Sequence, residues 1–105
     1  MTRIAIVEDE AAVQEQLAGD VQRYTRQYGT PFEVTEFADG MEILEDYRPQ
    51  FDIIFLDIEM PELGGMDAAE RIRTVDPDVV LVFVTNMAQY AIRGYEVDAL
   101  SLIHI

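Results

Sequence analysis

The sequence predicts an α/β fold with a doubly wound parallel sheet, and two observations predict it. Short, continuously apolar runs recur along the chain, and amphipathic helical patterns separate them. Runs without a polar face are typical of strands buried on both sides, as in parallel sheets. Regular alternation with helices implies right-handed crossovers, which place helices on both faces of the sheet.

Five segments are predicted to form strands. Three are continuous apolar runs rich in branched side chains, and the second in chain order alternates in part and carries charge, as an edge strand does. The last segment closes the alternating pattern. In chain order the five segments are 4–7, 32–37, 53–56, 79–84 and 98–105.

Four helices are predicted between these strands. The first covers about 18 residues, because one apolar stripe recurs at steps of three or four, and Gly29 is a suitable C-terminal cap. The stripe consists of Val13, Leu17, Val21, Tyr24 and Tyr28. A short second helix covers 39–47 and ends before Pro49. The third contains Met66, Ala69, Ile72 and Arg73 and stops near Asp76, and a weaker fourth covers 87–94.

Length and composition narrow the class of protein. The 105 residues suit one domain, and the 21 acidic against 7 basic side chains give a net charge of −14. That charge argues against nucleic acid or an anionic membrane as a direct partner. The absence of Cys excludes disulfides and thiol chemistry, and the only histidine is His104. No apolar run reaches the length of a membrane span, so a cytoplasmic domain is expected.

Acidic and hydroxyl side chains follow the predicted strands. Glu8 and Asp9 follow the first strand, Asp57 the third, and Thr85 the fourth. In doubly wound sheets the ligand crevice lies at the carboxyl ends of the strands, where the winding reverses. If the first and third strands are neighbours, Asp9 and Asp57 lie close together. Such carboxylates suit Mg²⁺, beside which an aspartate can become an aspartyl phosphate.

Ordinary structural roles could also explain each residue. Asp9 and Glu10 could cap the first helix, Asp57 could be a loop acid, and Thr85 or Asn86 could cap the fourth helix. Each alternative is reasonable singly. Together they require three unrelated coincidences at one edge of the sheet, so we favour a functional site.

With these residues placed, the chain resembles the receiver domain of two-component response regulators from residue 3 to about 100. Three segments carry the resemblance: residues 4–10, residues 55–65 with a Met-Pro turn and a Gly after Asp57, and Val84-Thr85. Residues 89–100 are similar to the subgroup whose output is a LytTR-type DNA-binding domain. The resemblance implies a flavodoxin-like sheet of five strands in the order 2-1-3-4-5.

The resemblance also implies roles for individual residues. Asp57 would accept a phosphoryl group from a phosphohistidine of a sensor histidine kinase. Mg²⁺ would be held by Asp9, Asp57 and the backbone carbonyl of Glu59, with Glu8 reaching the ion through water. Thr85 would hydrogen-bond the phosphoryl group. Such a domain modifies itself and acts as a switch, controlling a DNA-binding output domain that lies outside residues 1–105.

The pattern departs from the family after Leu100. The subgroup normally continues with a switch aromatic and a phosphate-pairing Lys, but this chain has Ser101-Leu102-Ile103-His104-Ile105 there and contains no Lys. The family's last helix is also missing. We expect the uncovered sheet face and the sticky edge of the last strand to drive formation of a homodimer or a larger assembly.

Three alternative functions share some of these sequence features. A phosphorylation-impaired receiver that acts only through protein binding fits the missing Lys. A phosphatase of the haloacid-dehalogenase type would need a second Asp where Glu59 stands, and a longer chain. A flavin-binding module would need a hydroxyl-rich phosphate loop after the first strand, where this chain has acidic residues.

Overall fold

The computed structural model describes residues 1–29, 31–58, 63–85 and 101–104, with the backbone alone at Thr85 and at 101–104. The elements, in chain order, are β1 (Thr2–Val7), α1 (Ala11–Tyr28), β2 (Phe32–Phe37), α2 (Gly40–Leu44), β3 (Ile53–Asp57), α3 (Gly65–Val75), β4 (Val80–Thr85) and β5 (Ser101–His104). None of these helices is both long enough and apolar enough to cross a membrane.

The strands form a parallel sheet in the order β2-β1-β3-β4-β5. The winding reverses at β1, which pairs with β2 on one side and with β3 on the other. The doubly wound parallel architecture is therefore confirmed, and β2 lies at an edge as its charged pattern predicts. The short strand β5 pairs with β4 from Val82↔Ser101 to Thr85↔His104.

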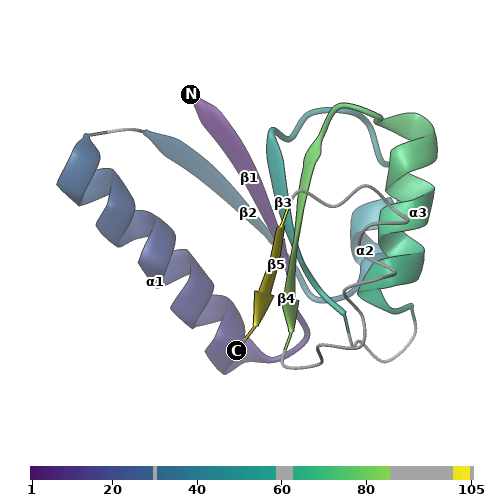
Figure 1. Cartoon of the computed structure of the whole chain (residues 1–105), viewed down its shortest axis with the longest axis horizontal. Coiled ribbons are helices and arrows are strands. Elements are labelled where there is room, and N and C mark those ends of the chain that lie inside the picture. Colours follow the sequence, from purple (N-terminus) through teal and green to yellow (C-terminus); the bar gives the residue numbers. More distant parts are fainter. Residues whose placement is uncertain (30, 59–62, 86–100, 105) are drawn as a thin grey trace.

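The described helices cover both faces of the sheet. Figure 1 shows α1 on one side and α2 with α3 on the other, and the view from above agrees. The main core lies between the sheet and α2 and α3, as alternate strand residues point there. Its fully buried strand members are Ala5, Val7, Ile54, Leu56, Leu81 and Phe83.

Helix α1 has the predicted length and end but packs more loosely than its stripe suggests. Gly29 adopts a φ of 71° and its N–H donates to the carbonyl of Thr25, which is the expected glycine cap. No residue of α1 is fully buried. Tyr24 and Tyr28, at the end of the stripe, are 49% and 60% exposed. The second half of α1 therefore leaves apolar surface open.

The second helix is shorter than predicted. It covers only Gly40–Leu44, with the Asp39 side chain accepting a hydrogen bond from the Glu42 N–H at 2.9 Å. Glu45 already has an extended ψ of 112°, and Asp46 has a φ of 53°, so the backbone leaves the helix before Tyr47. The ends of the strands shift by up to three residues from prediction, and the helix predicted over 87–94 lies outside the described residues.

Candidate functional site

Three carboxylates meet at the carboxyl ends of β1 and β3. Glu8 and Asp9 directly follow β1, and Asp57 is the last residue of β3. The register Val7↔Leu56 aligns the two strand ends. One carboxylate oxygen from each of the three residues lies within 4.8 Å of the other two. The prediction that Asp9 and Asp57 lie close together is confirmed, and Glu8 is equally near.

Glu8 is the buried member of this group. Its side chain is 4% exposed and accepts a hydrogen bond from the Glu10 N–H at 3.0 Å. Its pKa is raised to about 8, mainly by burial, with smaller contributions from the charge of Asp57 and hydrogen bonds to Asp9 and Asp57, and against the opposing effect of the Glu10 N–H. Without a cation, Glu8 is therefore largely protonated at neutral pH.

The same contact decides one of the alternative interpretations. Glu10 occupies the N-cap position of α1, but its side chain makes no capping hydrogen bond. Its N–H binds the carboxylate of Glu8 instead. The acidic run after β1 is thus organised around Glu8 and not around the capping of α1 by Glu10.

Gly65, the first residue of α3, lies against the backbone of Asp57. The Gly65 N–H donates to the carbonyl of Ile58 at 2.9 Å. A Cβ atom on Gly65 would lie 2.9 Å from the carbonyl carbon of Asp57 and would overlap its oxygen. Only glycine therefore permits α3 to begin this close to the end of β3. Sequence reasoning missed this role, for which the Gly64-Gly65 pair was the only signal.

The other predicted site residues are placed only in part. Thr85 is the last residue of β4. Because Asp57 pairs with Val84 on that strand, Thr85 lies at the carboxyl end of the sheet, as Asp57 does. The side chain of Thr85 is outside the description. Glu59 and Asn86 also lie outside the described residues, so their predicted roles stay predictions.

The donor set fits a hard divalent cation. It consists of carboxylate oxygens only, from one buried, one exposed and one half-buried side chain. Mg²⁺ prefers one or two carboxylates and retains water or phosphate oxygens in its remaining positions. Partial exposure of the group leaves room for such ligands.

Comparison with known proteins gives a consistent picture. The family description "Response regulator receiver domain" matches residues 4–104. The sensory transduction protein LytT of Bacillus subtilis (strain 168) is 32% identical over 100 residues, covering 95% of this chain and 40% of that protein. LytT of Enterococcus faecalis is 33% identical over 96 residues, covering 91% and 38%. The chain thus spans about 40% of the length of these relatives.

A solved structure shares the complete described fold. The response regulator TrrA from Thermotoga maritima, in complex with Mg²⁺ and BeF, superposes with a TM-score of 0.84 at 26% identity. The match covers 100% of this chain and 87% of that one. Likeness in both sequence and fold therefore extends across the edge of the sheet that carries the three carboxylates.

Proposed function

The chain belongs to the response regulator receiver domain family, and from this premise we propose that Asp57 is the residue that accepts the phosphoryl group. One observation carries the proposal: the Asp57 carboxylate ends β3 within 4.8 Å of the carboxylates of Glu8 and Asp9. Receiver domains are phosphorylated by histidine kinases. The donor proposed here is accordingly a phosphohistidine on a sensor kinase.

The proposed transfer uses Asp57 as the nucleophile. A carboxylate oxygen attacks phosphorus, so an oxygen–phosphorus bond forms as the bond from phosphorus to the histidine nitrogen breaks. That nitrogen then takes up a proton from solvent. The product is an aspartyl phosphate at the exposed edge of the sheet. The close approach of Gly65 restrains the Asp57 backbone at the end of β3.

A divalent cation is proposed as the cofactor. Asp9, Asp57 and the backbone carbonyl of Glu59 would hold Mg²⁺, and Glu8 would contact it through water. The ion supplies positive charge that offsets the carboxylates and the phosphoryl oxygens when it is bound. The oxygen-only donor set supports this assignment, because three carboxylates lie within 4.8 Å of one another.

Thr85 is proposed to hydrogen-bond the phosphoryl group from the end of β4. The family's Lys would normally add a positive charge there, and this chain contains no Lys among its 105 residues. Part of the phosphoryl charge then stays uncompensated, so we expect a low yield of aspartyl phosphate.

The family also supports a proposal for the location, the output domain and the assembly of this domain. We propose that residues 1–105 form a single cytoplasmic receiver domain that controls a DNA-binding output domain outside this chain. The relatives named LytT agree with the likeness of residues 89–100 to the LytTR-type subgroup. We also propose that β5, the last strand of the described sheet, promotes a homodimer or larger assembly, which light scattering over a dilution series would test.

A second candidate is a phosphorylation-impaired receiver that acts only by binding proteins. One observation favours it: the absence of Lys. Under this candidate the three carboxylates shape a docking surface and accept no phosphoryl group.

Treatment with acetyl phosphate and Mg²⁺ separates the two candidates. Mass spectrometry should find one phosphoryl group on the chain, labile to hydroxylamine, and absent from the Asp57→Asn variant. Asp78→Asn, at an exposed loop residue, is the matched control and should be modified like the wild type. Modification at another residue contradicts the assignment of Asp57, and no modification at any donor concentration supports the impaired receiver.

A further inference from the structure

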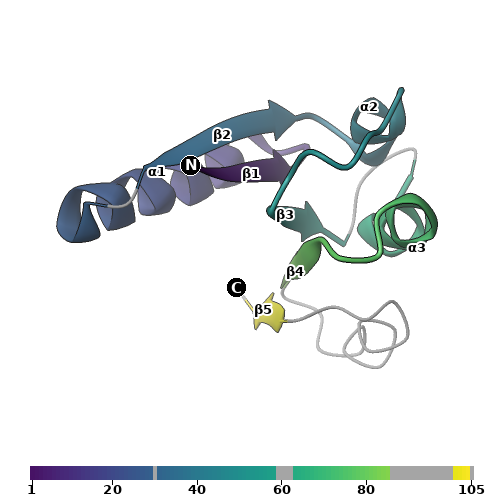
Figure 2. The same cartoon turned by 90° about the horizontal axis from the view of Figure 1, so that it is seen from above.

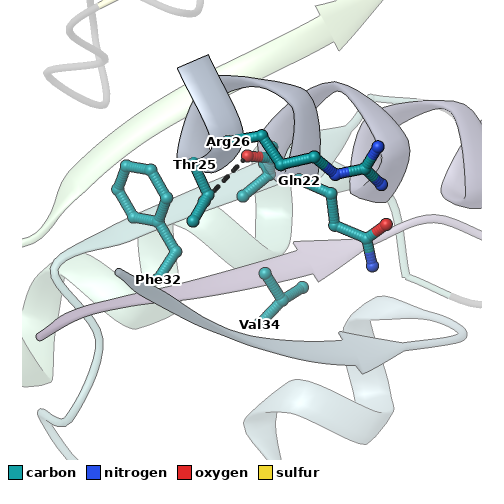
Figure 3. Close-up of a pocket in the computed structure, with 6 residues that line it drawn as sticks. Gln22, Thr25, Arg26, Phe32 and Val34 are labelled. Atoms are coloured by element: carbon teal, nitrogen blue, oxygen red, sulfur yellow. Dashed lines mark hydrogen bonds between the residues drawn. The ribbon is translucent and has the colours of Figure 1, made fainter. Parts of the chain in front are cut away.

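A groove separates the second half of α1 from the edge strand β2. It has a volume of about 380 Å³, and Figure 3 shows side chains from both elements around it. Val21, Phe32 and Val34 supply its apolar lining, and Gln22 and Arg26 supply polar groups. The hydroxyl of Thr25, which also lines the groove, donates to the carbonyl of Val21 at 3.1 Å and is thus satisfied. The groove therefore combines an apolar lining with the positive charge of Arg26.

Arg26 is the one charged residue among the described residues that line the groove. Arg26 forms no ion pair with any residue that the structure describes, whereas Arg23 pairs with Asp20. Tyr24 extends the apolar surface. Its ring packs at a tilt against the rings of Tyr28 and Phe32, whose centroids lie 4.5 and 5.7 Å from its own. An occupant that complements this surface presents an apolar side chain with carboxylates next to it.

The chain itself carries such a feature on α2. Met41 is 48% exposed, and the exposed side chains of Glu42 on α2 and Glu45 directly after that helix line the same surface, together with Arg71 of α3. Helix α2 lies at the opposite end of the molecule from the groove, along its longest axis (Figure 1), and Figure 2 agrees. The two surfaces therefore cannot meet within one molecule.

We propose that the groove of one copy receives α2 of a second copy. Met41 enters the slot formed by Val21, Phe32 and Val34, where its flexible thioether fits an irregular apolar surface. Glu42 and Glu45 face Arg26 of the other copy. Because the two surfaces lie at opposite ends, the contact is head-to-tail and extends into short chains instead of closing into a pair. It uses neither the carboxylate site nor the edge of β5.

The proposed contact between the groove and α2 of a second copy should be weak. A short helix in a shallow groove buries less area than a stable interface needs. The net charge of −14 opposes association, although salt screens it beyond about 8 Å under physiological conditions. We expect a dissociation constant of the order of 10⁻⁴ M.

Two charge reversals test the contact in the full chain. Arg26→Glu removes the cation of the groove but leaves α2 intact, and Glu45→Arg does the opposite. Each variant alone should have a lower sedimentation-average mass than the wild type at concentrations where the wild type associates head-to-tail. A mixture of the two should associate again into alternating head-to-tail chains, because both contacts between unlike copies join opposite charges, and the double variant should associate because its charges are exchanged. Asp78→Arg, with the same charge change as Glu45→Arg, should behave like the wild type.

NMR locates the contact independently of any association through β5. Addition of unlabelled Arg26→Glu to ¹⁵N-labelled Glu45→Arg should shift two sets of amides, those of Val21, Thr25 and Val34 at the groove and those of Met41 and Glu42 on α2. With the labels reversed, the same two sets should shift. Cooperative melting of each variant shows that it is folded. No shifts at millimolar concentration, or shifts confined to β5, overturn the proposal.

Discussion

Gly65 lies directly against the backbone carbonyl of Asp57, so the first turn of α3 begins in contact with the last residue of β3. The Gly65 N–H binds the next carbonyl, that of Ile58, at 2.9 Å. These contacts leave no room for a side chain at position 65. The proposed phosphoacceptor is thus held by a helix start that only glycine can form.

Replacement of Gly65 by Ala should therefore damage both stability and the site. The added methyl group would overlap the Asp57 carbonyl, so α3 must move away at a cost of about 1–3 kcal/mol, as in other overpacked positions. Urea unfolding should show that loss, and labelling by acetyl phosphate should fall below the wild-type yield.

Gly19→Ala is the matched control. Gly19 lies within α1, and a Cβ atom there would have no neighbour within 4 Å. Alanine favours the helix over glycine, so this variant should gain about 1 kcal/mol of stability and keep the wild-type labelling yield. Equal behaviour of the two alanine variants would contradict the role given to Gly65.

A second prediction concerns the metal site. Asp9→Asn removes one negative charge from three carboxylates whose oxygens lie within 4.8 Å of one another. Loss of a direct ligand should weaken Mg²⁺ binding by about tenfold or more. Isothermal titration with Mg²⁺ measures this, with Asp78→Asn as the control for net charge. Unchanged affinity in Asp9→Asn would remove the argument for a metal at this edge of the sheet.

A third prediction uses the titration of Glu8. Its pKa is about 8 in the folded chain against an ordinary value of 4.5, so between these values the folded chain holds a proton that the unfolded chain has released. The free energy of unfolding should therefore decrease as pH rises from about 4.5 to 8, and the stabilising contribution should be complete below that window.

Urea unfolding in EDTA across this pH range measures the effect. In Glu8→Gln the side chain cannot ionise, so the stability of this variant should fall less steeply with pH than that of the wild type. Mg²⁺ favours the ionised carboxylates, so saturating Mg²⁺ should reduce the difference in slope. Parallel pH profiles for the two proteins in EDTA would show that Glu8 is ionised in the folded state.

The sequence predicts the alternation of strands and helices well because buried parallel strands must be apolar throughout. The runs containing Ile6, Ile54 and Leu81 could have no other role in a chain of this length, and their alignment brings Asp57 to the end of β1. In this fold class the carboxyl ends of β1 and β3 are neighbours. The position of the carboxylate site could therefore be predicted from the sequence.

Burial and close contacts could not be predicted in the same way. The pattern treats Glu8 and Asp9 alike, yet Glu8 turns inward to the Glu10 N–H while Asp9 stays exposed. The end of the second helix depends on the positive φ of Asp46, which sequence pattern does not reveal. The periodicity of α1 shows only which side of the helix faces the sheet. How deeply that side is buried depends on the elements that pack around it.

A fourth prediction concerns the end of the sheet opposite the carboxylates. The Tyr47 hydroxyl donates to the Asp76 carboxylate at 2.7 Å, which ties the segment after α2 to the end of α3. Asp76 is 6% exposed, and burial together with this hydrogen bond raises the pKa of Tyr47 above its usual range. Arg73 donates to the carbonyls of Asp76, Pro77 and Val79 and fixes the same turn.

Tyr47→Phe should therefore destabilise the fold without changing the carboxylate site. The ring still packs against the core, but the buried Asp76 carboxylate loses its donor, at a cost of about 1–3 kcal/mol. Tyr28→Phe is the matched control, because Tyr28 is 60% exposed and its hydroxyl receives only a hydrogen bond from Gln27 at 3.3 Å. That variant should stay within about 0.5 kcal/mol of the wild type. Urea unfolding gives both values, and Mg²⁺ affinity should be unchanged in either variant. Similar stabilities for the two variants would mean that Asp76 finds another donor when the hydroxyl is removed, and that this contact does not stabilise the end of α3.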